Sequence, residues 1–252
     1  MPNVLVVGAS RGIGLAIVDT LLSQSDAALR VVAACRNPEQ ATALQALRRG
    51  YPDRLAIVTV DVADPHSISA LAQQVRQVTP SLDTVINTVG VLHEAAGGEG
   101  VPALRPEKAL SQLRADMLAR SFAVNAWAPI LLAQALQPLF SRQQPFVFAS
   151  LSARVGSIGD NQLGGWYSYR AAKAAQNQLL KTWAIELSRT HPLATVLILH
   201  PGTTDTDLSK PFSAHVAPDK LFSAERVARD LLAVIAARGP ADSGGFFDWA
   251  NE

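Results

Sequence analysis

Short apolar runs alternate along the chain with longer stretches in which apolar residues recur at helical spacing. A run without polar alternation is typical of a strand that is buried on both faces. Strands that alternate with helices predict a parallel sheet covered by helices on both faces, an α/β fold. The runs that we interpret as strands cover residues 4–7, 29–34, 55–60, 82–87, 145–150 and 194–199.

Helix signals fill the intervals between these runs. Helical spacing covers residues 13–22, 38–49 and 169–189. Asp64 and Pro65 suit the N-cap and the first position of a further helix, because the carboxylate accepts from backbone N–H groups and proline needs no N–H there.

The chain shows no repeat, low-complexity tract or linker, so we expect one domain over residues 1–252. Three long connections follow strands, at about residues 91–103, 153–168 and 203–221. Ligands of α/β folds bind at the carboxyl ends of the strands, so we expect these loops to form the substrate site.

Composition and charge exclude several classes of protein. The chain has 22 basic and 21 acidic residues and a net charge of +1, so no charge excess favours nucleic acid or a membrane surface. The lone Cys35 excludes an intramolecular disulfide. No basic leader and no apolar run of about 20 residues is present, so we expect a soluble, cytoplasmic protein. The histidines lack metal-ligand spacing, and we predict no metal.

A glycine-rich turn joins the first predicted strand to the first predicted helix. It reads Gly8-Ala9-Ser10-Arg11-Gly12-Ile13-Gly14. Glycine lets such a turn tighten and lets a pyrophosphate approach the backbone, while the helix N-terminus offers unpaired N–H groups to the anion. The spacing G-x-x-x-G-x-G differs from the common G-x-G-x-x-G, but its strand–turn–helix context predicts a dinucleotide site.

The end of the second predicted strand indicates which dinucleotide is bound. A carboxylate there would bind the ribose hydroxyls of NAD, whereas this chain has Arg36 and no acid before Glu39. A guanidinium fork suits a 2′-phosphate, and Arg11 would supply a second cation. We therefore predict NADP(H) in preference to NAD(H). The alternative is that Arg36 is a solvated surface charge.

Two further strand ends carry residues suited to the nucleotide. Asp61, followed by Val62, either accepts from the adenine amino group or caps a turn. The segment Asn87-Thr88-Val89-Gly90 follows the fourth strand, where Gly90 would let the backbone approach the ribose and the nicotinamide. The sequence leaves both interpretations of each signal open.

Tyr169 and Lys173 are the strongest candidates for acid–base chemistry. Their i,i+4 spacing places both side chains on one helix face. A phenol has an ordinary pKa of about 10, which a neighbouring ammonium lowers. Such a tyrosine exchanges a proton with an alcohol or carbonyl oxygen, while a nicotinamide cofactor supplies the hydride. Tyr167 lies six residues from Lys173 and therefore off that face.

Two further polar candidates lie upstream. Ser150-Leu151-Ser152 ends the fifth strand, where a hydroxyl would hydrogen-bond the substrate oxygen. Asn125 lies among apolar neighbours in a helical stretch, and a buried amide needs a partner. It either holds a water that links Lys173 to solvent as a proton relay, or it is a satisfied structural residue.

Taken together, these residues resemble the short-chain dehydrogenase/reductase family. They follow the family's order over nearly the whole chain, which also has Pro201-Gly202 followed by Thr206. The resemblance implies a single doubly wound Rossmann-type domain with a seven-stranded parallel sheet, whose last strand would be 245–249. The segments 164–169 and 201–209 resemble the branch of bacterial C-signal proteins and sniffer-type carbonyl reductases.

The resemblance implies a role for each matching residue. Tyr169 would be the acid/base, and Lys173 would lower its pKa and hold the cofactor ribose. Ser152 would orient the carbonyl, and Asn125 would anchor the relay. The implied cofactor contacts are Gly8, Ser10, Arg11, Gly12, Ile13, Gly14, Arg36, Asp61, Val62, Asn87, Val89, Gly90, Tyr169, Lys173, Pro201, Gly202, Thr204 and Thr206.

The chain departs from the family pattern at the serine. Counting back from Gly156, Ala153 occupies the usual serine position. Ser152 is the nearest hydroxyl, and Ser150 is the alternative.

The substrate pocket is expected above the nicotinamide. Segment 203–221 would cover it as a lid. His93 is either a polar contact of the pocket or a plain surface histidine, and we favour the surface histidine. Apolar and aromatic walls suit an apolar or aromatic carbonyl compound, and the predicted walls include Leu92, Ile158, Trp166 and Phe212.

We interpret the chain as an NADP(H)-dependent carbonyl reductase that transfers hydride between nicotinamide and a carbonyl or secondary alcohol. The alternative is an NAD(P)-binding signalling or regulatory protein that acts through partner contacts with little turnover. The presence of Tyr169 and Lys173 favours the enzyme, because a protein that only senses the nucleotide needs no acid–base residues. The family resemblance also implies a homodimer or homotetramer, assembled through helices at about 104–139 and from residue 169 onward.

Overall fold

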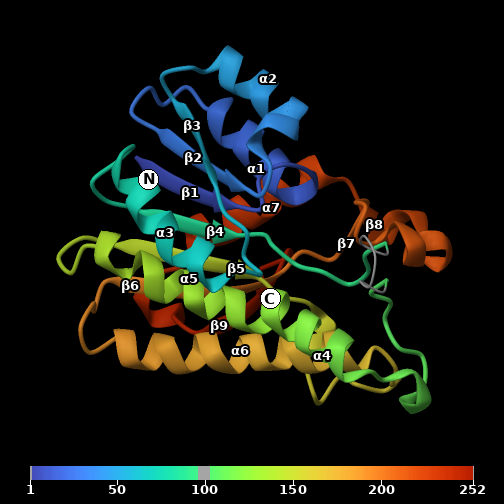
Figure 1. The fold of residues 1–252 in the computed structure, drawn as a ribbon. Coiled ribbons are helices and arrows are strands. Elements are labelled where there is room, and N and C mark those ends of the chain that lie inside the picture. The colour runs from blue at the N-terminus through green and yellow to red at the C-terminus, as the bar shows by residue number, and fades with distance from the viewer. Residues whose placement is uncertain (1, 96–102, 252) are drawn as a thin grey trace.

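The computed structural model describes residues 2–95 and 103–251, and it places one parallel sheet between two layers of helices (Figure 1). The order β3-β2-β1-β4-β5-β6-β9 reverses direction between β1 and β4, as in a doubly wound sheet. All neighbours pair in parallel. The predicted seven-stranded α/β fold is therefore confirmed. The strands are β1 (Asn3–Val7), β2 (Arg30–Cys35), β3 (Leu55–Thr59), β4 (Thr84–Asn87), β5 (Phe146–Leu151), β6 (Ala194–His200) and β9 (Gly245–Asp248).

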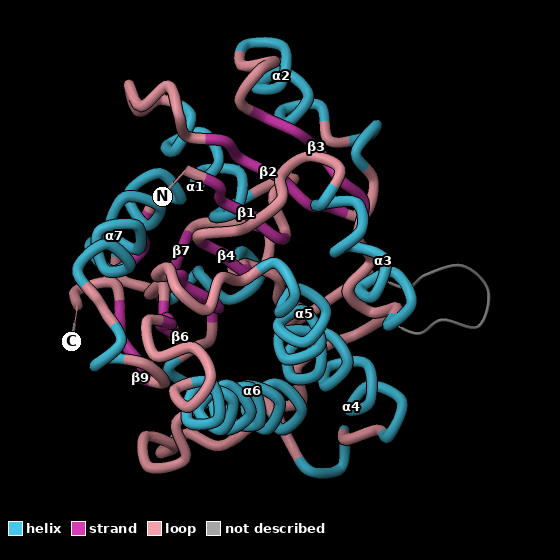
Figure 2. Tube along the Cα trace, turned by 90° about the vertical axis from the view of Figure 1, so that its left-hand side faces the viewer, coloured by secondary structure: helices cyan, strands magenta, loops and turns pink. Residues whose placement is uncertain are grey.

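Successive residues of the central strand face opposite helix layers. Val4 and Val6 pack in one core with α1 and α7, whereas Leu5 and Val7 pack in a second core with α3, α5 and α6. Figure 2 shows these helix groups on opposite sides of the strands. The unbroken apolar runs follow from this arrangement, because both faces of each strand are buried. The helices are α1 (Gly12–Leu22), α2 (Thr42–Gly50), α3 (Pro65–Arg76), α4 (Ala115–Phe122), α5 (Ala128–Leu136), α6 (Tyr167–Leu187) and α7 (Ala224–Ala237).

The predicted start of α3 is confirmed. The Asp64 carboxylate accepts from the His66 N–H at 2.9 Å, and Pro65 takes the first helical position. The proline has no N–H to leave unpaired there, and the aspartate satisfies one of the orphan donors of the first turn.

The prediction of one continuous helix over 38–49 is wrong. A short 3₁₀ turn covers Pro38–Gln40, and α2 begins only at Thr42. Between them Ala41 has a ψ of 67°, which is not helical, and its side chain is buried against the first core. Burial of this alanine decides the break, and the polar pattern of the segment carries no sign of it.

The predicted helix over 104–139 is also wrong at its beginning. Leu104 instead pairs with Glu94 in an antiparallel bridge, with N–O distances of 3.0 and 3.1 Å. Pro106 follows closely, and proline restricts the residue before it to extended backbone. The helix begins at Ala115, and a π-helical turn, Ala123–Trp127, separates α4 from α5.

The long segment after β6 forms a small unit of its own at one end of the sheet. Its two short strands, β7 (Thr203–Thr204) and β8 (Leu221–Phe222), pair in parallel. Figure 1 shows this pair to one side of the main sheet. Of the predicted substrate loop 91–103, residues 96–102 lie outside the described residues. None of the described helices is long and apolar enough to cross a membrane.

Candidate active site

The glycine turn has the geometry of an anion cradle. A Cβ added to Gly14 would lie 2.3 Å from the Gly8 carbonyl oxygen, so only glycine lets α1 approach β1 this closely. Gly8 itself has a φ of +90°, in the region that favours glycine. The first intrahelical bond of α1 joins the Leu15 N–H to the Arg11 carbonyl. The N–H groups of residues 12–14 therefore have no helical partner and suit an anion.

Two cations flank this cradle. Arg36 is exposed at the end of β2, and no ion pair with it occurs among the described residues. Arg11 pairs with Asp207 at 2.6 Å, and the two side chains are 69% and 66% exposed. An ion pair this exposed contributes little to stability, so a phosphate can displace the carboxylate from Arg11.

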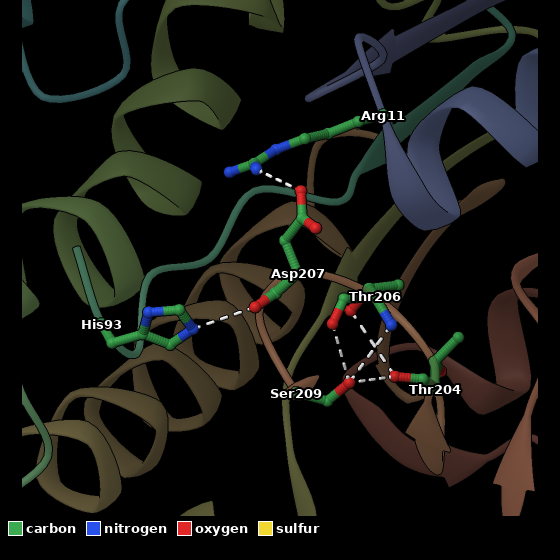
Figure 3. A network of polar contacts seen from close by, with 6 residues as sticks. All are labelled: Arg11, His93, Thr204, Thr206, Asp207 and Ser209. Carbon is green, nitrogen blue, oxygen red and sulfur yellow. Dashed lines mark hydrogen bonds and ion pairs between the residues drawn. The ribbon is translucent and has the colours of Figure 1, made fainter. Parts of the chain in front are cut away.

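The segment after β7 lies across the cradle (Figure 3). The carbonyl of Asp207 hydrogen-bonds Nε2 of His93 at 2.9 Å, and a Cβ on Gly12 would lie 3.3 Å from Cγ2 of Thr206. The Ser209 hydroxyl bonds the carbonyls of Thr204 and Thr206 and holds this turn together. The structure thus brings Thr206 to the glycine turn. It also shows that His93 is no plain surface residue, because its ring joins two loops.

The predicted nucleotide contacts at the ends of β3 and β4 have protein partners. Oδ1 of Asp61 accepts from the Ala63 N–H at 3.0 Å, which is the turn cap. Asn87 is buried, donates to Ser150 Oγ at 2.9 Å and accepts from the Val89 N–H at 3.2 Å. Neither contact tests adenine or ribose binding, so both roles stay predictions. Val62, the residue after Asp61, is buried. Gly202, which follows Pro201, has a φ of +72°, and a Cβ added to it would lie against the Phe222 ring.

Tyr169 and Lys173 are buried together on the first turns of α6. Their side chains are 8% and 2% exposed, and Nζ of the lysine lies 5.8 Å from the centroid of the phenol ring. Burial raises the pKa of the Tyr169 phenol above its ordinary value and lowers the pKa of the Lys173 amine to about 7. Near neutral pH the tyrosine is thus a protonated acid, and the lysine is poised between its charged and neutral forms.

The lysine faces the loop after β4. A Cβ added to Gly90 would lie 3.8 Å from Lys173 Nζ and 3.5 Å from Asn125 Oδ1. Glycine at this position therefore leaves open the space beside the ammonium. The segment 87–90 is predicted to line the ribose, so the structure brings Lys173 of the predicted acid–base pair to this part of the predicted nucleotide site.

Asn125 lies in the π-helical turn and is fully buried. Its amide pairs with the backbone of Val91 in both directions: Oδ1 accepts from the Val91 N–H at 2.9 Å, and Nδ2 donates to the Val91 carbonyl at 2.7 Å. Nδ2 also lies 3.2 Å from Ser121 Oγ. The side chain is a satisfied amide that ties the helix to the loop after Gly90. The predicted relay water stays a prediction.

The two candidate serines have different hydrogen-bond partners. Ser150 has no exposed surface, and its Oγ accepts from Asn87 and from Gln176 Nε2. Ser152 donates to Asn177 Oδ1 at 2.6 Å. Asn177 lies about 12 Å along α6 from Tyr169, at the helical rise of ~1.5 Å per residue. Asn177 thus accepts the Ser152 hydroxyl proton in this structure, and the predicted role of Ser152 in orienting the carbonyl stays a prediction.

Ser152→Ala is therefore expected to lower kcat/KM for carbonyl reduction by less than about ten-fold. The hydroxyl is already engaged with Asn177, away from the acid, and its loss removes one hydrogen bond worth about 1 kcal/mol. The measurement is steady-state kinetics beside thermal unfolding. A loss of ~100-fold or more, with unfolding unchanged, would support the predicted role.

Glu107 is a buried acid that the sequence patterns do not indicate. Its side chain is 2% exposed, Oε2 accepts from the Ser168 N–H at 3.2 Å, and Oε1 accepts from the Ser168 hydroxyl. Its backbone carbonyl accepts from the Trp166 N–H at 2.5 Å. A carboxylate at this place satisfies orphan donors and complements the helix dipole. It thus holds the end of α6 that carries Tyr169.

Glu107→Ala is expected to lower the free energy of unfolding by about 1–3 kcal/mol, because it leaves two buried donors at the start of α6 without their acceptor. The measurement is urea unfolding. The matched control is Glu39→Ala, which removes an exposed glutamate. Equal stability of the two variants would contradict the proposed anchoring of α6.

An aromatic row leads outward from Tyr169. The ring centroids of Tyr169 and Trp166 are 6.3 Å apart. The centroids of Trp166 and Phe212 are 5.1 Å apart, and those of Phe212 and His93 are 5.8 Å apart. Trp166 and Phe212 are thus brought together beside the acid, as their predicted role requires. Leu92 is buried and Ile158 is 86% exposed, and their predicted places in the pocket wall stay predictions.

Comparisons with known proteins show the family of the chain. A family model described as short chain dehydrogenase matches residues 2–217. The chain is 32% identical over 250 residues to 1-hydroxy-2-glutathionyl-2-methyl-3-butene dehydrogenase of Rhodococcus sp. (strain AD45), covering 98% of this chain and 96% of that one. It is 37% identical over 135 residues to C-signal of Myxococcus xanthus, covering 54% of this chain and 75% of that one.

The fold also matches a solved structure with a nucleotide. The NADPH-bound carbonyl reductase from chicken fatty liver superposes with a TM-score of 0.85 at 28% identity, over 100% of this chain and 98% of that one. The predicted resemblance, including that to the C-signal branch, is confirmed by these matches.

Proposed function

The chain belongs to the short-chain dehydrogenase family, and on that premise we propose that it is an NADP(H)-dependent carbonyl reductase. The observation that carries the proposal is the burial of Tyr169 beside Lys173, next to the open face of Gly90. Burial of a phenol and an amine costs folding free energy, and titratable groups whose pKa values burial perturbs in this way cluster at functional sites.

The residues present fit a nicotinamide dinucleotide phosphate. The N–H groups of residues 12–14 suit the pyrophosphate, and Arg36, which forms no ion pair with any described residue, suits the 2′-phosphate. When bound, the cofactor supplies the hydride. Lys173 has three N–H donors, of which the Leu151 carbonyl and Gln176 Oε1 accept two at 2.9 Å each. No other described residue accepts from Nζ, so the third donor can bind a ribose hydroxyl.

Tyr169 supplies the proton. Because burial keeps the phenol protonated at neutral pH, it is ready to donate to a carbonyl oxygen as that oxygen gains negative charge. A charged Lys173 stabilises the resulting phenolate. Trp166 and Phe212 provide an apolar surface beside the acid, which excludes water and suits an aromatic or apolar carbonyl compound.

The test is oxidation of NADPH by the purified protein with a panel of ketones, aldehydes and diketones. We expect turnover of at least one aromatic carbonyl compound, with NADPH used in preference to NADH. Cofactor binding without any oxidation across the panel would overturn the proposal.

A second candidate is a signalling or regulatory role, which the similarity to C-signal of Myxococcus xanthus favours. In this case the protein would bind NAD(P) and act through contacts with partners. The same experiment separates the two functions, because a contact-based role predicts tight nucleotide binding and negligible turnover.

A further inference from the structure

Gln176 is a polar side chain without exposed surface in the middle of α6. It lies one turn beyond Lys173, on the same helix face. A buried amide without partners would destabilise the fold, so its hydrogen bonds indicate what it holds in place.

Both ends of this amide are engaged. Oε1 accepts from Lys173 Nζ at 2.9 Å. Nε2 donates to Ser150 Oγ and to the Leu151 carbonyl, each at 3.1 Å. The Leu151 carbonyl also accepts from Lys173 Nζ, at 2.9 Å. The amide, the ammonium and the end of β5 therefore form a closed set of hydrogen bonds.

The same set reaches the loop that is predicted to line the ribose. Ser150 Oγ accepts from Asn87 Nδ2 at 2.9 Å, and Asn87 Oδ1 accepts from the Val89 N–H at 3.2 Å. One glutamine thus links the amine of α6 to the ends of β4 and β5. Its position decides where the ammonium stands relative to Gly90.

We propose that Gln176 is a positioning residue that holds the Lys173 ammonium beside Gly90 and favours its charged form. The proposal rests on the role of Lys173 in the proposed function. The amide oxygen directs the negative end of its dipole at the ammonium, which offsets part of the cost of burying that charge.

The surroundings of Lys173 make this one acceptor important. Burial lowers the pKa of the amine to about 7, so a modest change in hydrogen bonding changes its charge at neutral pH. In the described part of the chain Lys173 Nζ hydrogen-bonds the Leu151 carbonyl and Gln176 Oε1, lies over the ring of the titratable Tyr169, and forms no ion pair with a carboxylate.

The test measures the pKa of Lys173 directly. The chain has five lysines, so NMR with ¹³Cε-labelled lysine gives few signals, and Lys173→Met identifies the one that titrates near pH 7. We expect Gln176→Met to lower the pKa of this lysine by about one pH unit, the size expected for losing one hydrogen bond to a charged group. The matched control is Gln178→Met, the same change at an exposed position of α6, which leaves the pKa unchanged.

A second variant tests the sign of the effect. Gln176→Glu keeps an acceptor for the ammonium and adds a negative charge, so we expect it to raise the pKa of Lys173 above that of the wild type. It also remains informative if Gln176→Met fails to fold. A role confined to packing would lower the unfolding temperature of both variants without moving this pKa. An unchanged pKa in every variant that folds would overturn the proposal.

Turnover provides an independent readout. Carbonyl reduction uses the charged Lys173 to stabilise the forming phenolate, so activity falls as pH rises through the pKa of this amine, and Gln176→Met is expected to move that falling limb of the kcat–pH profile downward by about one unit. The NMR titration needs no substrate. If the wild type lacks turnover, the proposed function fails while the titration still decides the role of Gln176.

Discussion

Tyr169→Phe is expected to lower kcat/KM for carbonyl reduction by about 10²–10⁴-fold, the usual contribution of a positioned general acid. The substitution removes only the phenolic hydroxyl and keeps the ring that packs against Trp166. Nucleotide affinity is therefore expected to stay near that of the wild type, and the loss falls on kcat. Steady-state kinetics with calorimetric binding of NADPH measures both.

Tyr167→Phe is the matched control for this experiment. Tyr167 begins α6, is 40% exposed, and lies two residues from the proposed acid. The same loss of a hydroxyl there is expected to leave kcat/KM within about two-fold, because an exposed hydroxyl contributes little. Equal activity of the two variants would contradict the assignment of Tyr169 as the acid.

Arg36→Ala is expected to weaken NADPH binding by about 10–100-fold and to leave NADH binding nearly unchanged. The reason is that a hydrogen-bonded charge pair contributes about 1.5–3 kcal/mol, and each 1.4 kcal/mol or so corresponds to ten-fold in affinity. Arg36 is exposed and free of ion pairs among the described residues, so its removal costs the fold little. Calorimetry with both nucleotides measures the preference.

Arg49→Ala serves as the control, because Arg49 is an exposed arginine in the last turn of α2. It changes the net charge equally and is expected to preserve the preference for NADPH. If Arg36→Ala still binds NADPH in preference to NADH, other groups bind the 2′-phosphate. Arg11 is then the first to examine, since it lies at the glycine turn and its ion pair is with the exposed Asp207.

The sequence alone determined the order of strands and helices and the candidates for the nucleotide and the acid. These features depend on residues close together in the chain: apolar runs for β1 to β6, glycine spacing for residues 8–14, and i,i+4 spacing for Tyr169 and Lys173. Local patterns are reliable in such places, because turn geometry and helix periodicity act over a few residues.

Only the tertiary structure decided the partners of the buried polar groups. Ser168 finds Glu107 across 61 residues, Ser152 finds Asn177 across 25, and Asn87 finds Ser150 across 63. Glu107 and Asp207 carry no periodic signal, and the helical spacing that puts Gln176 on the face of Lys173 does not reveal its partners on β5, because these contacts follow from which strand ends and loops meet at one edge of the sheet. A buried polar atom must take whichever partner the packing brings within about 3 Å, and no spacing along the chain encodes that choice.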